Sequence, residues 1–175
     1  MIPYPRIKAH LDQVRKAITS DNRPYGLHRA RKESFFCGEK IAVLRKCVGR
    51  PLFSYSNFPC YLSATFYVLQ THRWDMKFLT GVLNSQLIAY WLRHRGKMQG
   101  GNYQLDKEPL LNIPLPPPGS CDEKPIAALV DKILAAKKEN PAADTSKWEA
   151  EIDEKVFDLY DLTPDEREIV KGGEK

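Results

Sequence analysis

The sequence predicts an α+β fold, in which a small, mostly antiparallel curved sheet with flanking helices precedes a C-terminal helical hairpin or bundle. Residues 40–46, with a compact apolar centre, and residues 52–55 and 61–69 read as short strands that turn sequences separate, and the last is rich in aromatic and β-branched side chains. Residues beyond 120 instead carry apolar side chains at helical spacing. With 175 residues and 42% hydrophobic content, the chain has enough apolar material to form a core.

The elements before residue 113 follow a simple order. Apolar side chains at positions 7, 11, 14 and 18 predict an amphipathic helix over residues 6–19, which the turn sequence 21–26 ends. The three short strands follow, and an antiparallel meander is the most economical way to pair them. Residues 76–95 are apolar nearly all round, which predicts a mostly buried helix.

A proline-rich segment at residues 113–120 marks the expected domain boundary. Successive prolines remove backbone donors and favour an extended conformation, so this segment predicts a stiff connector. We therefore expect an α+β domain over residues 1–115 and a helical appendage over residues 116–175 that packs on it.

Three capping boxes predict where the tail helices begin. In each box a Ser or Thr side chain caps a helix and a Glu three residues later bonds back to the cap. Helices are thus expected from about residues 121, 147 and 164, and the first two should form an antiparallel hairpin around residues 140–145. The boxes pair Ser120 with Glu123, Ser146 with Glu149 and Thr163 with Glu166.

Charge is divided unevenly along the chain. Residues 1–121 contain 18 Lys and Arg against 7 Asp and Glu, whereas residues 122–175 contain 9 against 15. An excess of positive charge in one segment indicates a polyanionic partner, of which nucleic acid is the most abundant. The alternative is a lysine-rich surface that serves solubility alone. The acidic tail is expected either to pack on a partner or to keep negative charge away from the polyanion.

Several kinds of catalytic and metal site can be set aside. Residues 96–101 have the glycine spacing of a P-loop, but Asn102 and Tyr103 stand where the phosphate-binding Lys and the hydroxyl must follow. No dinucleotide-binding glycine motif follows a strand, and the four His and four Cys lack metal-ligand spacing. The Asn/Asp-Pro-Pro-Tyr motif of adenine methylation is also missing. We expect no catalytic residue, metal or cofactor in this fragment.

Cellular context follows from the same features. No apolar run approaches the length of a membrane span, and the first residues do not resemble a secretory signal. Unpaired cysteines suit a reducing compartment, so a cytoplasmic location without membrane contact is expected.

Binding residues are sought among the cations and amides. Arg and Lys reach phosphates, Arg can also bond guanine, and the side-chain amides of Asn and Gln can read adenine. The segment 99–104 has a second interpretation, a glycine turn leading into a strand with Tyr103 packed inward, and the two roles can coexist. The candidate DNA-binding residues are Arg29, Arg31, Lys32, Arg45, Lys46, Arg50, Arg95, Lys97, Gln99, Asn102, Tyr103 and Gln104.

Six segments also follow one another in a recognisable order and spacing. They are residues 4–7, 21–29, 38–41, 83–85, 95–104 and 109–114. Together they resemble the C-terminal specificity domain of TaqI-like adenine-N6 DNA methyltransferases, including fused restriction–modification enzymes. The acidic helices expected at residues 126–130 and 152–170 resemble the tail of the same proteins.

The resemblance implies a target recognition domain for double-stranded DNA. Such a domain enters the major groove and fixes the register in which one adenine is flipped out for methylation. It works beside the methyltransferase catalytic domain of the same polypeptide, which binds S-adenosylmethionine, and the parent enzyme is expected with or without an endonuclease. A block at residues 96–104 that is shared by readers of different sites cannot select the site, so base choice is expected from residues 45–57 and 29–37.

Two other functions remain open from the sequence. The chain could be a protein-interaction or scaffold specificity module that docks separate catalytic subunits through its helical tail, with Trp148 and Tyr160 as anchors. An RNA-binding module that uses exposed aromatic side chains is the weaker alternative, because the strand aromatics are expected to pack in the core.

Overall fold

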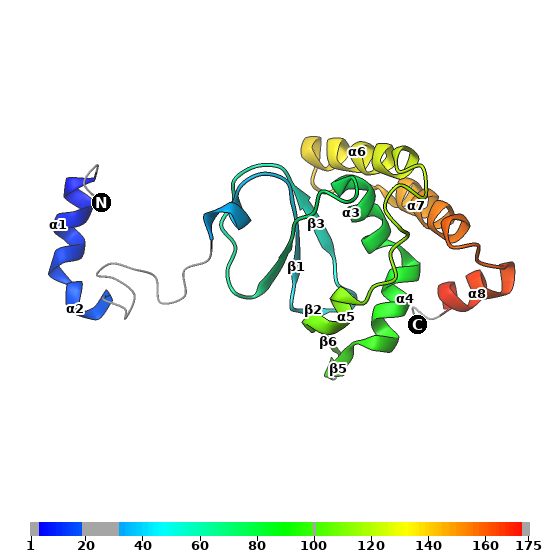
Figure 1. The fold of residues 1–175 in the computed structure, drawn as a ribbon, viewed down its shortest axis with the longest axis horizontal. Coiled ribbons are helices and arrows are strands. Elements are labelled where there is room, and N and C mark those ends of the chain that lie inside the picture. The colour runs from blue at the N-terminus through cyan, green and yellow to red at the C-terminus, as the bar shows by residue number, and fades with distance from the viewer. Residues whose placement is uncertain (1–3, 19–31, 100, 173–175) are drawn as a thin grey trace. The chain divides into compact units, whose positions relative to one another are not determined.

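A computed structural model describes residues 4–18, 32–99 and 101–172 of the chain, the side chains of Ile18, Met98 and Gln99 excepted. The chain divides into two compact units, Met1–Ser34 and Phe35–Lys175. The fold class predicted from the sequence is confirmed, because helices flank two small antiparallel sheets and further helices follow them (Figure 1). The helices and strands described below are those of Figure 1.

The first unit contains a broken helix. Where one helix was expected over residues 6–19, the structure has α1 (Pro5–Gln13) and α2 (Arg15–Ile18). The backbone N–H of Val14 donates to the carbonyl of Leu11, three residues back, which tightens the last turn of α1 and interrupts the α-helical ladder.

The 3-10 turn η1 (Glu33–Phe36) spans the boundary between the two units, and the larger unit continues with a sheet in the order β3-β1-β4. Its strands are β1 (Lys40–Leu44), β3 (Phe53–Ser56) and β4 (Phe66–Leu69). The expected meander is wrong, since β1 lies in the centre and pairs antiparallel with both of the others. The fully buried Lys40 explains part of this arrangement, because its ammonium donates to the carbonyl of Phe58 at 2.7 Å and so ties down the β3–β4 connection.

A second sheet of three-residue strands was not expected as a separate unit. It has the order β2-β6-β5 and consists of β2 (Lys46–Val48), β5 (Lys97–Gln99) and β6 (Asn102–Gln104). Arg45 joins the two sheets, because its N–H donates to the carbonyl of Thr65 and its own carbonyl accepts from the N–H of Leu105, both at 2.9 Å.

The core forms around two helices where one was expected. The buried segment 76–95 divides into α3 (Met76–Asn84) and α4 (Gln86–Arg95), with extended backbone at Ser85 between them. The hydroxyl of Ser85 accepts from the N–H of Ile88, and Asp153 accepts from the N–H of Gln86 at 2.8 Å. These contacts satisfy backbone donors at the start of α4, so the chain can begin a second helix in a new direction.

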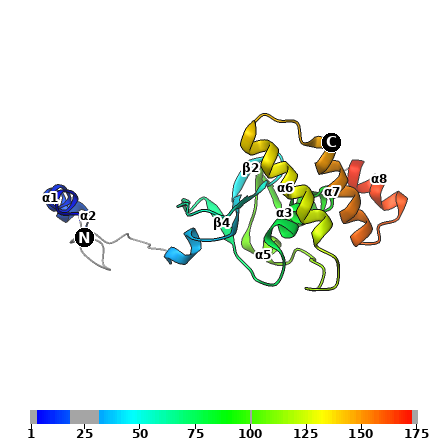
Figure 2. The same cartoon turned by 90° about the horizontal axis from the view of Figure 1, so that it is seen from above.

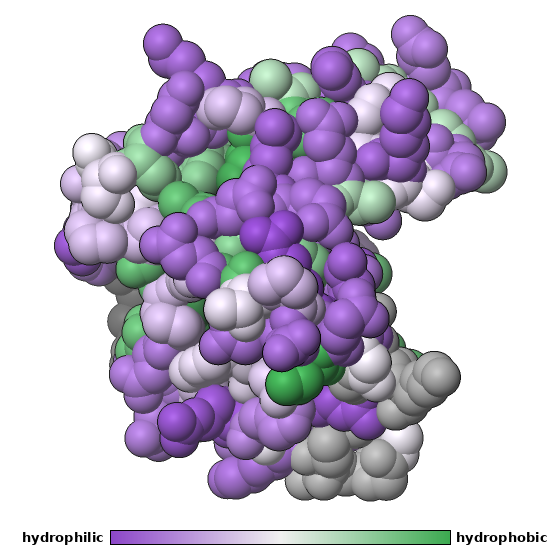
Figure 3. Space-filling view, turned by 90° about the vertical axis from the view of Figure 1, so that its right-hand side faces the viewer, coloured by the Kyte–Doolittle hydropathy of each residue, from purple (hydrophilic) through white to green (hydrophobic). Residues whose placement is uncertain are grey.

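The remaining helices are α5 (Lys107–Leu111), α6 (Lys124–Glu139), α7 (Ser146–Leu159) and α8 (Pro164–Gly172). The chain reverses between α6 and α7, as the predicted hairpin requires, and α6 crosses over α3 (Figure 2). This crossing is close, since a Cβ on Gly81 would lie 2.5 Å from Ile126 Cγ2. Viewed from the side of α8, the surface is mostly hydrophilic (Figure 3).

Only one of the three predicted capping boxes forms. Thr163 and Glu166 bond reciprocally at the start of α8, through Thr163 N–H to Glu166 Oε2 at 2.8 Å and Glu166 N–H to Thr163 Oγ1 at 3.4 Å. At the other two sites tertiary or neighbouring groups compete. Glu123 accepts from the backbone of Asp75, and Thr145 takes the N-cap position of α7.

The proline-rich segment is anchored on both sides. Trp74 Nε1–H donates to the carbonyl of Pro116 at 3.1 Å, and the Tyr160 hydroxyl donates to the carbonyl of Pro114 at 2.6 Å. Side chains of the first sheet, of α3 and α4 and of the tail share one hydrophobic cluster. The expected domain boundary between residues 115 and 116 stays a prediction. No helix within the described ranges is long and apolar enough to cross a membrane.

Candidate nucleic-acid interface

The second sheet brings together several of the predicted binding residues. Its register aligns Lys46 and Lys97 on either side of Gln104, and aligns Val48 and Gln99 on either side of Asn102. Successive residues of a strand point to opposite faces, so the side chains of Lys46, Lys97, Asn102 and Gln104 share one face and that of Tyr103 lies on the other. Lys46, Lys97 and Asn102 are exposed and Gln104 is partly exposed. The face therefore presents ammonium groups beside side-chain amides.

Tyr103 belongs to the opposite, buried face. It is 2% exposed, and its hydroxyl donates to the carbonyl of Leu92 at 2.6 Å. Gly96 makes this contact sterically feasible, because a Cβ at that position would overlap the Tyr103 hydroxyl. The structure thus gives Tyr103 the inward-packed role and removes it from the residues available to DNA. Gly96 in turn allows α4 and β6 to pack closely.

Asp106 contacts two side chains of the exposed face. Its carboxylate accepts from Gln104 Nε2 at 2.9 Å and lies 3.2 Å from the ammonium of Lys97. Hydrogen bonds from Gln104 and Lys97, together with the nearby charge of Arg45, hold the pKa of Asp106 below its ordinary value. Gln104 is consequently held in a defined position, whereas Lys97, whose side chain is 73% exposed, stays accessible from solvent. The sequence analysis did not predict a role for Asp106, because in the sequence it is simply the first residue of an Asp-Lys-Glu segment of the kind common on protein surfaces.

Arg45 is held at the junction of the two sheets. Both of its backbone groups are hydrogen-bonded, and its guanidinium lies 5.1 Å from the centre of the Tyr67 ring. An arginine over an aromatic face is partly immobilised by a cation–π contact. Because Arg45 is also exposed, its donors stay accessible from solvent next to Lys46. This arrangement suits an arginine that contacts a base or a phosphate.

The other predicted cations are placed differently. Arg95 is exposed at the end of α4 and shares a pocket with Lys97. Arg50 lines a separate hollow formed mainly by β3, α3, α6 and α7. Lys32 is exposed and belongs to the first compact unit. Arg29 and Arg31 lie outside the described residues.

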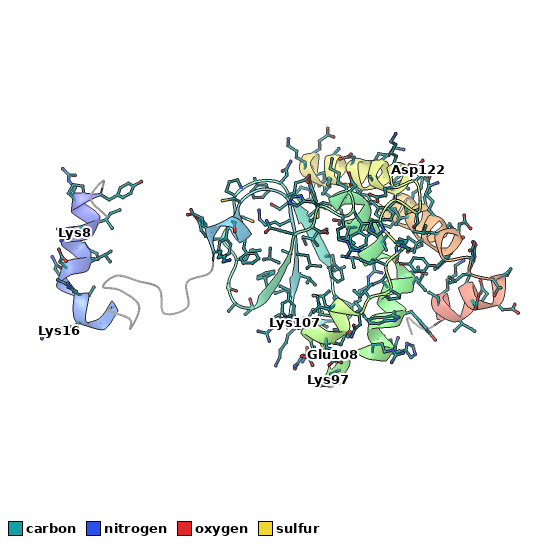
Figure 4. The ribbon with its side chains drawn as sticks, viewed as in Figure 1. Lys8, Lys16, Lys97, Lys107, Glu108 and Asp122 are labelled. Carbon is teal, nitrogen blue, oxygen red and sulfur yellow. The ribbon has the colours of Figure 1, made fainter. Side chains whose placement is uncertain are left out.

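Further charged residues gather at the same end of the larger unit. Figure 4 shows Lys97 together with Lys107 and Glu108, below the first sheet in that view. Lys107 is exposed at the start of α5. Sequence reasoning did not single it out, because a lone lysine between two acidic residues carries no pattern that indicates a site.

The fold is thus an α+β arrangement whose small exposed sheet presents cations and amides. Residues 7–115 match the family model described as the TaqI-like C-terminal specificity domain. The match covers more than half of the chain, which therefore belongs to this family. The family assigns it a DNA-recognition role in restriction–modification, and a specificity domain is in itself non-catalytic. No curated protein matches the sequence.

Proposed function

We propose that this chain is the DNA target recognition domain of an adenine-N6 DNA methyltransferase or fused restriction–modification enzyme. It binds duplex DNA and positions it for methylation by the catalytic domain of the same polypeptide, with or without cleavage by a nuclease. S-adenosylmethionine, which supplies the methyl group, belongs to that catalytic domain. The family membership supports the general role, and the finer assignment follows the segments that resemble adenine-N6 enzymes.

The observation that carries the proposal is the exposed face of the β2-β6-β5 sheet. Lys46 and Lys97 flank Gln104 there, and Asn102 follows in the next row. Ammonium groups neutralise phosphates and amides can bond base edges, so one small face offers both kinds of contact. We assign Arg45, Lys46, Arg95, Lys97, Asn102 and Gln104 to this interface, together with Gln99, whose backbone pairs with Asn102.

Duplex binding by the 175-residue chain at several salt concentrations tests the proposal. With about six phosphate contacts, log K should fall against log[salt] with a slope near −5. The double variant Lys46→Ala/Lys97→Ala should lower the magnitude of that slope by about 2, because two phosphate contacts are lost. The matched control is Lys132→Ala/Lys138→Ala, which removes the same charge from exposed positions on α6. Affinity that is unchanged between low and high salt would contradict duplex binding by this face.

The scaffold alternative has less support in the described contacts. Trp148 and Tyr160, its expected anchors, both pack against the hydrophobic core, and Tyr160 also bonds Pro114. Side chains used in this way offer less surface to a separate catalytic subunit. A pull-down with candidate methyltransferase subunits distinguishes the two functions, since the proposed domain needs no separate partner chain.

A further inference from the structure

A pocket of about 550 Å³ borders the candidate interface and shares Arg95 and Lys97 with it, but the function proposed above does not use its interior. Its lining comes from the end of α4, from β5 and from the segment that leads through α5. Trp91 and Arg95 are four residues apart on α4 and so lie on the same side of that helix. The residues that line the pocket are Trp91, Arg95, Lys97, Asp106, Glu108, Pro109 and Asn112.

The charges of the lining indicate what kind of ligand fits. Two cations, Arg95 and Lys97, face two carboxylates, Asp106 and Glu108, so the formal charge balances. Lys97 and Asp106 are moreover paired at 3.2 Å. A phosphate requires an excess of donors and positive charge, which this lining does not provide. A neutral ligand with both hydrogen-bond donors and acceptors matches it better.

The remaining groups favour a planar heteroaromatic ligand. Trp91 contributes an indole that is only partly buried, and indole rings provide stacking surfaces for nucleobases. Asn112 is exposed and carries an amide that can bond both the ring nitrogen and the amino group of adenine. The carboxylate of Glu108 can accept from an exocyclic amino group, as Glu does with cytosine.

The position of the pocket identifies the source of such a ligand. Lys97 and Asp106 belong both to the pocket and to the exposed face of the β2-β6-β5 sheet. DNA bound along that face would therefore lie next to the pocket. We infer that this pocket binds one unstacked nucleobase of the bound DNA, with Trp91 as the stacking surface and Asn112 as a hydrogen-bonding group. The inference rests on the proposed function, because it needs DNA on the neighbouring face.

Three DNA probes of one sequence test the inference with the 175-residue chain. The first is a matched duplex, the second carries a single unpaired adenine, and the third carries an abasic site in place of that adenine. The second and third share a distorted backbone, but only the second offers a base. Stacking of one base should make the adenine-bulged DNA bind about tenfold tighter than the abasic DNA.

Two variants locate the effect. Trp91→Leu should remove most of the tenfold preference, and Asn112→Ala should reduce it, while both leave the affinity for the matched duplex unchanged. Asn112 is exposed, so Asn112→Ala leaves the core intact. This variant therefore still tests the inference if Trp91→Leu perturbs folding. Trp148→Leu is the matched control, because it makes the same change in α7 and should retain the preference.

Equal affinity for the adenine-bulged and abasic probes would overturn the inference, and so would a preference that survives in both variants. Failure of the proposed function gives a different result. In that case the matched duplex itself would bind without salt dependence, and no variant on the β2-β6-β5 face would change its affinity.

Discussion

The exposed β2-β6-β5 sheet and the helical tail are stabilised in different ways. The sheet has strands of three residues, carries cations and amides on its outer face, and is held by a few specific contacts such as that between Tyr103 and Leu92. The tail has long helices with a continuous apolar face, an excess of acidic residues and a reciprocal cap at α8. One region depends on single contacts, whereas the other distributes its stability over many.

This difference corresponds to the separate roles that we expect for the two regions, binding for the sheet and stabilisation for the tail. Side chains exposed for binding contribute little burial, so the short sheet relies on anchors beneath it. The acidic tail packs through α6 on α3 and shares the hydrophobic cluster with the first sheet. Substitutions in the two regions should therefore separate effects on DNA binding from effects on stability.

The largest expected effect comes from Gly96→Ala. The added Cβ would overlap the buried Tyr103 hydroxyl and approach the carbonyl of Leu92, so we expect a loss of about 3 kcal/mol in the free energy of unfolding. Urea unfolding measures the loss, and duplex affinity should fall as well because β6 shifts.

Gly81→Ala is the matched change on the tail side. There the Cβ would lie 2.5 Å from the Cγ2 methyl of Ile126 and 3.2 Å from that of Val130, so α6 must shift slightly. No backbone atom is in the way, and a loss of about 1–2 kcal/mol is expected with duplex affinity retained. A larger loss for Gly81→Ala than for Gly96→Ala would reverse the comparison.

Within the binding region, Arg45→Ala should change sequence discrimination, whereas Lys97→Ala should change overall affinity. We expect Arg45 to bond a base, so its removal should lower discrimination at one position by about 1–3 kcal/mol. We expect Lys97 to contact a phosphate, so its removal should weaken binding to all sequences alike. Selection of bound sequences from a randomised duplex pool measures both effects. An unchanged sequence profile for Arg45→Ala would remove this arginine from base recognition.

The sequence predicted the elements that are stabilised by residues close together in the chain. It did not predict the elements that depend on partners far away in the chain. The apolar faces of α6 and α7 repeat over several turns, and the Thr163–Glu166 box lies within four consecutive residues. Strands of three residues carry no readable period, and β2 pairs with β6 far along the chain. The exposed face of the candidate interface depends on that pairing. The sequence could therefore suggest its residues, but it could not show that they lie side by side.

Distant partners also explain the errors in helix boundaries. Asp153 accepts from the N–H of Gln86, 67 residues away, and helps to start α4 where a continuous helix was expected. Glu123 accepts from the N–H of Asp75, 48 residues away, instead of completing a capping box. Neither contact leaves a trace in the local sequence. Lys40 is similar, since its burial against the carbonyls of Gly38 and Phe58 follows from the β3–β4 connection.

Alkaline pH should lower the free energy of unfolding, because each of the two regions contains a tyrosine with a raised pKa. Burial raises the pKa of Tyr103 to about 12, and burial also raises the pKa of Tyr160 to about 12. In the unfolded chain both ionise near the ordinary value of about 10. Their stabilising effect is therefore complete below about pH 10 and is lost as the pH rises toward 12.

Urea unfolding at pH 9 and at pH 11 measures this loss. Tyr103→Phe and Tyr160→Phe should each make the free energy of unfolding fall less steeply between these two values than it does in the unchanged chain. If neither substitution alters the pH dependence, then other groups cause it.

The smallest effect is expected at the start of α8. Thr163→Ala removes the hydroxyl that accepts from the N–H of Glu166, and loss of an N-cap costs about 1 kcal/mol. Thr163→Ser keeps the hydroxyl and should retain most of the stability, which separates the cap from the side-chain methyl. Because α8 contains none of the residues assigned to the interface, duplex affinity should not change in either variant. A measurable loss of DNA binding in Thr163→Ala alone would show that the tail supports the binding face directly, and that the two regions are coupled.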